Sequence, residues 1–113
     1  MKIYIKPLSV NTCWQGRRFK TRAYKDYEEE LLYLLPKSLK VPIPKRGRIE
    51  LNIRYGFSSK AGDLDNPTKP FLDILQKKYG FDDKVIYRLV IEKEDTEKGG
   101  EYIYFEVNKL SPF

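Results

Sequence analysis

Three segments of this chain alternate apolar and polar residues, which is the pattern of strands with one buried face. They span residues 49–55, 85–91 and 103–107, and a shorter one spans residues 2–5. A helix repeats every 3.6 residues and would spread these apolar side chains around its whole surface. The alternation therefore predicts a sheet, and the segments between the strands must supply the elements that cover it.

The two segments that predict helices have clear ends. The first runs from Thr21 as N-cap to Leu35, with apolar side chains three or four residues apart. The second begins with Asn66 as N-cap and Pro67 at the first helical position, and it ends at Gly80. Each segment has one apolar face, which predicts that both helices pack on the sheet.

The predicted order of elements is β-α-β-α-β-β. The last two strands, at residues 85–91 and 103–107, are predicted to form an antiparallel hairpin across a polar turn. A chain of 113 residues, of which 41% are hydrophobic, supports one core. We expect an α+β (mixed α/β) fold in a single small domain over residues 1–113, with a mixed sheet and two helices packed on it.

The composition excludes several classes of protein. The chain contains no histidine and one cysteine, Cys13, so histidine-based triads, zinc–histidine sites and an intramolecular disulfide are ruled out. Its apolar runs are too short to span a bilayer, and residues 1–7 lack the apolar stretch of a signal peptide. We therefore expect no membrane partner and a cytoplasmic location.

The charge is uneven along the chain. Residues 1–48 hold 12 basic and four acidic side chains, a net charge of +8, whereas residues 49–113 hold 10 basic and 12 acidic, a net charge of −2. A polyanion-binding surface beside a cation-dependent site would produce this asymmetry. The solvated surface of a small soluble domain would produce it as well, so charge alone leaves both interpretations open.

The most informative motif lies at the start of the second helix. Asp63 and Asp65 are two residues apart, so in an extended backbone both carboxylates point to the same side. Two hard oxygen ligands with open positions are how proteins usually hold Mg²⁺. Asp82 and Asp83 follow the same helix. Taken alone, the first pair is more often a helix cap, and the second is more often an exposed turn.

Lys69 completes the motif, four residues after Asp65 and four before Asp73. Its ammonium group would neutralise phosphate charge or protonate a leaving oxygen beside the carboxylates. The alternative is a surface ion pair with Asp73 at i,i+4 spacing, worth only about 0.3–0.5 kcal/mol.

The run GDLDNPTKPFLDILQ, followed by GFDDKVIYRL, resembles the RusA family of Holliday-junction resolvases. These enzymes share the Asp-Leu-Asp-Asn run, a lysine four residues after the second Asp, and a later Asp-Asp before a strand. Residues 6–11 are similar to the family's opening segment, although Lys6 replaces its first proline. Residues 58–62 lack the arginines that some members carry directly before the first Asp.

The resemblance implies a homodimeric, Mg²⁺-dependent endodeoxyribonuclease of DNA repair and recombination that nicks four-way junction DNA symmetrically. Such enzymes are bacterial and are often carried on phages and prophages. Carried over by position, the metal ligands are Asp63, Asp65 and Asp83, and the essential catalytic lysine is Lys69. Asp83 is preferred to Asp82 because the family's third carboxylate aligns with the second residue of that pair.

Basic residues near the amino terminus are the predicted DNA contacts. They surround Trp14 and Phe19, whose rings would offer a stacking surface at the crossover of the junction. The predicted contacts are Arg17, Arg18, Lys20, Arg22 and Lys25. A solvated loop is the alternative interpretation of the same charges.

Two other functions stay open from the sequence. One is a catalytically inactive nucleic-acid-binding module with the same fold. The other is a transferase whose Asp-x-Asp pair holds a nucleotide–metal complex. The second is disfavoured because 113 residues leave little room for a nucleotide-binding domain and no glycine-rich phosphate loop is present, so no nucleotide cofactor is expected.

Overall fold

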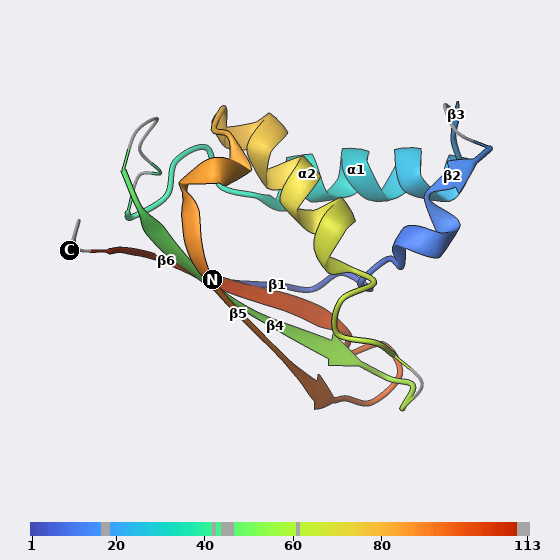
Figure 1. Ribbon diagram of the computed structural model, residues 1–113. Helices are drawn as coiled ribbons and strands as arrows, with labels where there is room; N and C mark the ends of the chain where they lie inside the picture. Colours follow the sequence, from blue (N-terminus) through green and yellow to red (C-terminus); the bar gives the residue numbers. More distant parts are fainter. Residues whose placement is uncertain (17–18, 42, 44–46, 61, 111–113) are drawn as a thin grey trace.

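The computed structural model describes residues 1–16, 19–41, 43, 47–60 and 62–110. Its main sheet and its two long helices form two layers, with both helices on the same face of the sheet (Figure 1). The main elements are β1 (Lys2–Ile3), α1 (Arg22–Leu34), β4 (Ile49–Phe57), α2 (Thr68–Tyr79), β5 (Ile86–Asp95) and β6 (Tyr102–Lys109). The smaller ones are the 3-10 turns η1 (Val10–Thr12) and η2 (Asp83–Val85) and the strands β2 (Trp14–Gln15) and β3 (Phe19–Lys20).

The sheet has the strand order β1-β6-β4-β5. Strand β4 is parallel to β5 and antiparallel to β6, and β1 is antiparallel to β6. The predicted α+β class with a mixed sheet is confirmed. The predicted hairpin of the last two strands is wrong, because β5 and β6 flank β4 on opposite sides and do not pair with each other.

Burial explains why β4 occupies the centre. Its inward side chains, Ile49, Leu51 and Ile53, are almost completely buried, whereas most residues of β5 are exposed. A strand buried in this way needs a neighbour on each edge. Helix α2 carries the chain back over the sheet so that β5 enters parallel to β4, as a parallel pair requires. The next residues pass the end of β4, where the Thr96 N–H donates to the Phe57 carbonyl at 2.8 Å.

The core lies between the helices and the sheet. Helix α1 contributes Tyr24, Tyr27 and Leu31 to it, and α2 contributes Phe71, Ile74 and Leu75. The rings of Phe71 and Phe105 meet edge to face at 5.6 Å, which joins α2 to β6. One continuous cluster of buried side chains therefore holds both helices on the sheet.

Three of the four helix ends agree with the sequence prediction. One of them is the end of α1, whose C-cap is Leu35. Thr21 caps α1 by accepting a hydrogen bond from the Tyr24 N–H at 3.1 Å, as predicted. Gly80 ends α2 in the left-handed conformation at φ 68°, where glycine carries no steric penalty. At the start of α2 the N-cap is Pro67 and not Asn66, because Asn66 turns its side-chain amide toward Asp63 at 3.1 Å.

The face of the sheet that carries no helix is polar. Strands β4, β5 and β6 present alternating polar side chains there, including Glu50, Asn52 and Arg54 of β4. Within the described ranges, no helix is long and apolar enough to cross a membrane.

Candidate nucleic-acid and metal site

The loop that carries Asp63 and Asp65 is fastened to the sheet by a buried hydrogen-bond chain. Both aspartates are exposed. Behind them, the Thr68 hydroxyl donates to the Leu64 carbonyl at 3.0 Å, and the Tyr55 hydroxyl of β4 lies 2.8 Å from the same Thr68 oxygen. Because the Thr68 proton is used on Leu64, Tyr55 must be the donor in that second bond. The acidic loop therefore has a fixed base and an exposed carboxylate edge.

Burial raises the pKa of the Tyr55 hydroxyl well above its usual range, so this group stays protonated and keeps donating. Thr68 is the buried polar residue that sequence reasoning missed. A threonine directly after Asn-Pro gives no local signal of such a role, since its partner lies 13 residues earlier on another element.

The amino-terminal segment packs directly against this loop. The Val10 N–H of η1 donates to the Asn66 carbonyl at 2.8 Å. The same segment is tied to the start of α1, where Thr21 donates from its N–H to the Cys13 carbonyl and from its hydroxyl to the Thr12 carbonyl. The structure therefore places η1 beside the acidic loop, and it joins the segment that follows η1 to the start of α1.

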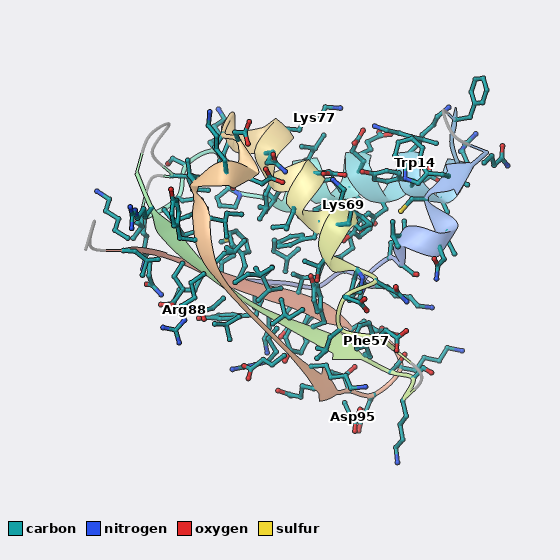
Figure 2. All side chains as sticks on the ribbon, in the orientation of Figure 1. Trp14, Phe57, Lys69, Lys77, Arg88 and Asp95 are labelled. Atoms are coloured by element: carbon teal, nitrogen blue, oxygen red, sulfur yellow. The ribbon has the colours of Figure 1, made fainter. Side chains whose placement is uncertain are left out.

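Lys69 stands in the first turn of α2, as labelled in Figure 2. Its ammonium group forms an ion pair with Asp73 at 2.9 Å, which is the surface i,i+4 pair that the sequence offered as the alternative. Asp73 raises the pKa of Lys69, and the charge of Asp83 adds to that increase. Lys69 is therefore a mostly exposed cation within electrostatic reach of one predicted carboxylate.

The second acidic pair, after α2, is divided between two roles. The Asp82 carboxylate caps η2 by accepting a hydrogen bond from the Lys84 N–H at 3.0 Å, and this bond lowers the pKa of Asp82. Asp83 donates its backbone N–H to the Gln76 side chain at 3.1 Å and is exposed. Asp82 is thus committed to a turn, whereas Asp83 is the member that the family pattern selects.

The three predicted ligands do not form one group. Asp63 and Asp65 precede the 12-residue helix α2, and Asp83 follows it. Among the residues that the structure describes, no three or more His, Cys, Asp or Glu side chains gather closely enough to hold a metal ion. The donor chemistry of Asp63 and Asp65 suits Mg²⁺, which binds through one or two carboxylates with water and substrate phosphate completing its shell.

Two of the five predicted DNA contacts, Arg17 and Arg18, lie outside the described residues. The other three are placed at the start of α1 and beside it. Lys20 pairs with Glu28 at 3.1 Å, Arg22 pairs with Asp26 at 3.4 Å, and Lys25 is exposed.

Sequence reasoning missed the residue that ties Lys20 down. Glu28 is largely buried and also contacts Lys77 of α2 at 3.2 Å. Burial opposes its ionisation, but the hydrogen bonds from the two lysines prevail and lower the pKa of Glu28. Glu28 therefore fixes β3 and α2 against α1.

Two aromatic rings stand on the short β2–β3 ribbon beside these cations. Phe19 is 71% exposed. Trp14 is held edge-on against Tyr24 with ring centroids 5.7 Å apart, yet remains exposed. Exposed aromatic rings beside a basic side chain are the kind of surface on which unpaired bases can stack.

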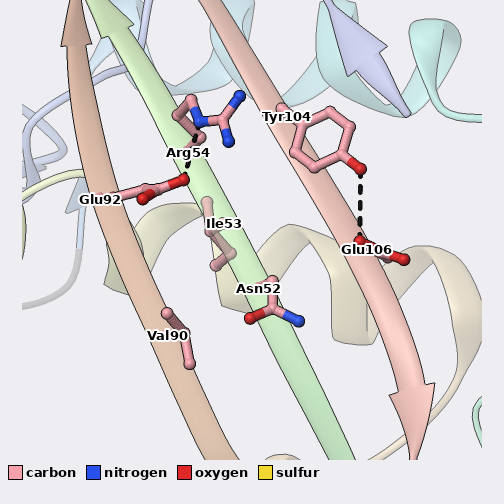
Figure 3. Close-up of a pocket in the computed structure, with 7 residues that line it drawn as sticks. All are labelled: Asn52, Ile53, Arg54, Val90, Glu92, Tyr104 and Glu106. Carbon is pink, nitrogen blue, oxygen red and sulfur yellow. Dashed lines mark hydrogen bonds and ion pairs between the residues drawn. The ribbon is translucent and has the colours of Figure 1, made fainter.

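A pocket on the helix-free face of the sheet lies away from all of these residues (Figure 3). It is lined by Asn52, Ile53, Arg54, Val90, Glu92, Tyr104 and Glu106. Its charged groups are already paired, with Arg54 bonded to Glu92 at 2.8 Å and Tyr104 to Glu106 at 3.3 Å. The predicted site residues have no part in this pocket.

Fold and site together define a small α+β domain in which exposed carboxylates and a lysine lie at the start of a helix, and η1 contacts the loop that carries the carboxylates. The family model described as Endodeoxyribonuclease RusA matches residues 8–106, and the chain belongs to this family. The resemblance seen in the sequence is confirmed. No curated protein matches the chain.

Proposed function

We propose that this protein is a Mg²⁺-dependent endonuclease that resolves four-way DNA junctions by paired, symmetrical nicks, acting as a homodimer. The observation that carries the proposal is the contact between η1 and the acidic loop, through Val10 and Asn66, in a chain of the RusA endodeoxyribonuclease family. This contact supports the proposal because the predicted phosphate-binding residues follow η1 in the chain, and η1 is bonded to the loop that carries Asp63 and Asp65.

Asp63, Asp65 and Asp83 are the proposed ligands of the cation. When bound, Mg²⁺ supplies the activation of water and the relief of charge on the phosphoryl oxygens that hydrolysis needs. In the free protein the Asp63–Asp65 pair is exposed at the edge of its fastened loop, whereas Asp83 lies after α2, from where its charge reaches Lys69. Asp83 would join the same cation only if the two loops approach each other on the DNA.

Lys69 is proposed to act on the scissile phosphate. Its pKa is raised by Asp73 and Asp83, so its ammonium group stays charged throughout the working pH range. A fixed positive charge beside the phosphate stabilises the charge that develops in the transition state. For this role the side chain must leave Asp73, and an exposed ion pair of this kind is weak enough to exchange.

The predicted contacts Arg17, Arg18, Lys20, Arg22 and Lys25 are proposed to neutralise backbone phosphates. Phe19 and Trp14 are proposed to stack on bases that are unpaired at the crossover. A junction has two symmetry-related strands to cut, and a two-fold dimer presents one acidic loop to each of them.

The experiment is cleavage of a synthetic mobile four-way junction with and without Mg²⁺, with a linear duplex of the same sequence as control. The proposal expects paired nicks in opposing strands of the junction, none without the cation, and little cutting of the duplex.

The inactive binding module is the second candidate, because the three carboxylates are not assembled in the free protein. Tight junction binding without any nicking in Mg²⁺ or Mn²⁺ would select that candidate and reject the enzyme.

A further inference from the structure

The two edges of the sheet are very different. One edge is β1, which has two residues. The other is β5, which has ten, and within the described part of the chain it pairs with β4 alone (Figure 1). A long edge strand leaves a row of N–H and C=O groups unpaired, and proteins usually shorten, bend or charge such edges. The edge at β1 is protected by its shortness, whereas the edge at β5 is open.

The first half of β5 is also apolar and exposed. Tyr87, Leu89 and Val90 are 60%, 41% and 37% exposed, and residues 86–91 contain a single charge, Arg88. Leu89 lies opposite the buried Leu51 of β4, on the helix side of the sheet, and Val90 lies opposite Asn52, on the helix-free side. The strand therefore offers apolar surface on both faces next to its unpaired backbone.

We propose that β5 pairs antiparallel with β5 of a second copy of this chain, about a two-fold axis at Val90. This deepens the homodimer of the proposed function by assigning its interface. Two residues that lie opposite each other on neighbouring strands point to the same face of the sheet. The pairing of the two β5 strands can therefore shift only in steps that leave each side chain on its own face. With Val90 on the axis, Arg88 faces the partner's Glu92 and Leu89 faces the partner's Ile91, so the residues nearest the axis match in charge and in apolar character. Only the outer residues Tyr87 and Ile86 face the charged Lys93 and Glu94 of the partner.

The neighbouring registers lose this match. With Leu89 on the axis, Arg88 faces the partner's Val90 and has no acidic residue opposite. With Ile91 on the axis, Arg88 faces the partner's Glu94, but Val90 faces the partner's Glu92 and Leu89 faces the partner's Lys93, so the apolar pairs are lost. Opposite charges and apolar pairs directly across an antiparallel ladder stabilise it, so the register centred at Val90 is favoured.

The charges already present in one copy extend across the proposed interface. Arg88 pairs with Glu50 at 3.1 Å, and Glu92 pairs with Arg54 at 2.8 Å, as Figure 3 shows for the second pair. Across the axis, the row on the helix-free face would run Glu50, Arg88, the partner's Glu92 and the partner's Arg54. Negative and positive side chains alternate along this whole row. This charge complementarity favours a second copy of the chain as the partner over an unrelated strand.

The proposed dimer would place both acidic loops on one side of the sheet. A two-fold axis perpendicular to the continued sheet keeps α1 and α2 of both copies on the same face. Both acidic loops and both basic ribbons would then face the same side of an eight-stranded sheet, where one junction could contact them together.

The test is disulfide trapping without DNA, which separates the interface from the nuclease activity. Directly opposed strand residues have Cα atoms about 4.5–5.5 Å apart, within the range of a disulfide. In mild oxidant, Val90→Cys should form a covalent dimer much faster than Leu89→Cys or Ile91→Cys. Tyr33→Cys, on the exposed surface of α1, is the control and should form no covalent dimer, and native Cys13 is fully buried.

Sedimentation of Leu89→Lys is the second arm, with Tyr33→Lys as its matched control. The lysine at Leu89 should weaken self-association at least tenfold, while the control should leave it unchanged. If the native chain is a dimer but Val90→Cys traps no faster than Tyr33→Cys, the β5 interface is wrong and the dimer stands elsewhere. A native chain that is monomeric at tens of micromolar, yet still makes paired nicks, would refute both the interface and the dimer.

Discussion

The two acidic pairs at the ends of α2 use the same side chain in different ways. Before the helix, Asp63 and Asp65 stand exposed on a loop whose base is locked by the Tyr55–Thr68 hydrogen bond, and Asp63 accepts a hydrogen bond from the exposed side-chain amide of Asn66. After the helix, the Asp82 carboxylate accepts a hydrogen bond from the Lys84 N–H and caps η2. A carboxylate that already accepts a backbone N–H is stabilised where it is, whereas one at a solvent-facing edge is available to a cation. Hydrogen-bond commitments therefore distinguish the candidate ligands better than sequence spacing does.

The largest contrast is expected within the second pair. Replacing Asp83 by Asn keeps the shape and removes the charge, and we expect junction nicking to fall at least about 100-fold, the scale of lost electrostatic stabilisation of a transition state. Asp82→Asn is the matched control, because its amide oxygen still caps η2, and its nicking rate should stay within about threefold of the native rate. Equal losses in both variants would show that the pair acts structurally.

The basic segment sharpens the contrast because it follows η1, whose Val10 contacts the loop of the first pair at Asn66. Replacing Arg17, Arg18 and Lys20 together by Ala should weaken junction binding by about tenfold or more and flatten the plot of log affinity against log salt, since each phosphate contact contributes to that slope. The readout is a salt titration of binding, with Lys37, Lys40 and Lys109 replaced together as the control. An unchanged slope in the first variant would remove these residues from the DNA contacts.

The anchor of the acidic loop gives the next effect. Thr68→Val keeps the volume but leaves the buried Tyr55 hydroxyl without its acceptor, which costs about 1–3 kcal/mol of unfolding free energy. Urea denaturation measures the loss. Tyr55→Phe in the same background should recover part of it, because the orphaned hydroxyl is gone. No recovery would mean that the bond does not hold the loop.

The smallest effect concerns Asp73, the ion-pair partner of Lys69. Asp73→Asn removes the exposed ion pair, so stability should change by only about 0.3–0.5 kcal/mol. If Lys69 works at the phosphate, freeing it should leave nicking unchanged or faster, whereas Lys69→Ala should abolish most of it. Parallel loss of activity in both variants would instead make the ion pair itself the functional unit.

Local signals predicted the local structure well. The cap at Thr21, the stop at Gly80 and the alternation of β4, β5 and β6 all depend on residues a few positions apart. Strand order could not be predicted in the same way, because alternation says which face is buried and not which strand is the neighbour. The wrong hairpin and the misplaced N-cap at Asn66 both arose where a distant partner decided the outcome.

The same limit applies to the site. The motif supplied Asp63, Asp65, Asp83 and Lys69 as candidates, but it could not show that a helix separates the first two from the third. It also could not show that Thr68 locks the loop or that Glu28 joins Lys20 to Lys77, since these contacts join elements distant in sequence.

The most direct test of the central role given to the exposed acidic loop is the nicking rate of a mobile four-way junction in Mg²⁺ for Asp63→Asn and Asp65→Asn. Junction affinity would be measured alongside in Ca²⁺. Each change should reduce nicking at least about 100-fold, the scale of lost transition-state stabilisation, and leave binding equal or tighter, because repulsion between carboxylate and phosphate is relieved. Normal cutting by either variant would contradict the assignment of that aspartate to the site.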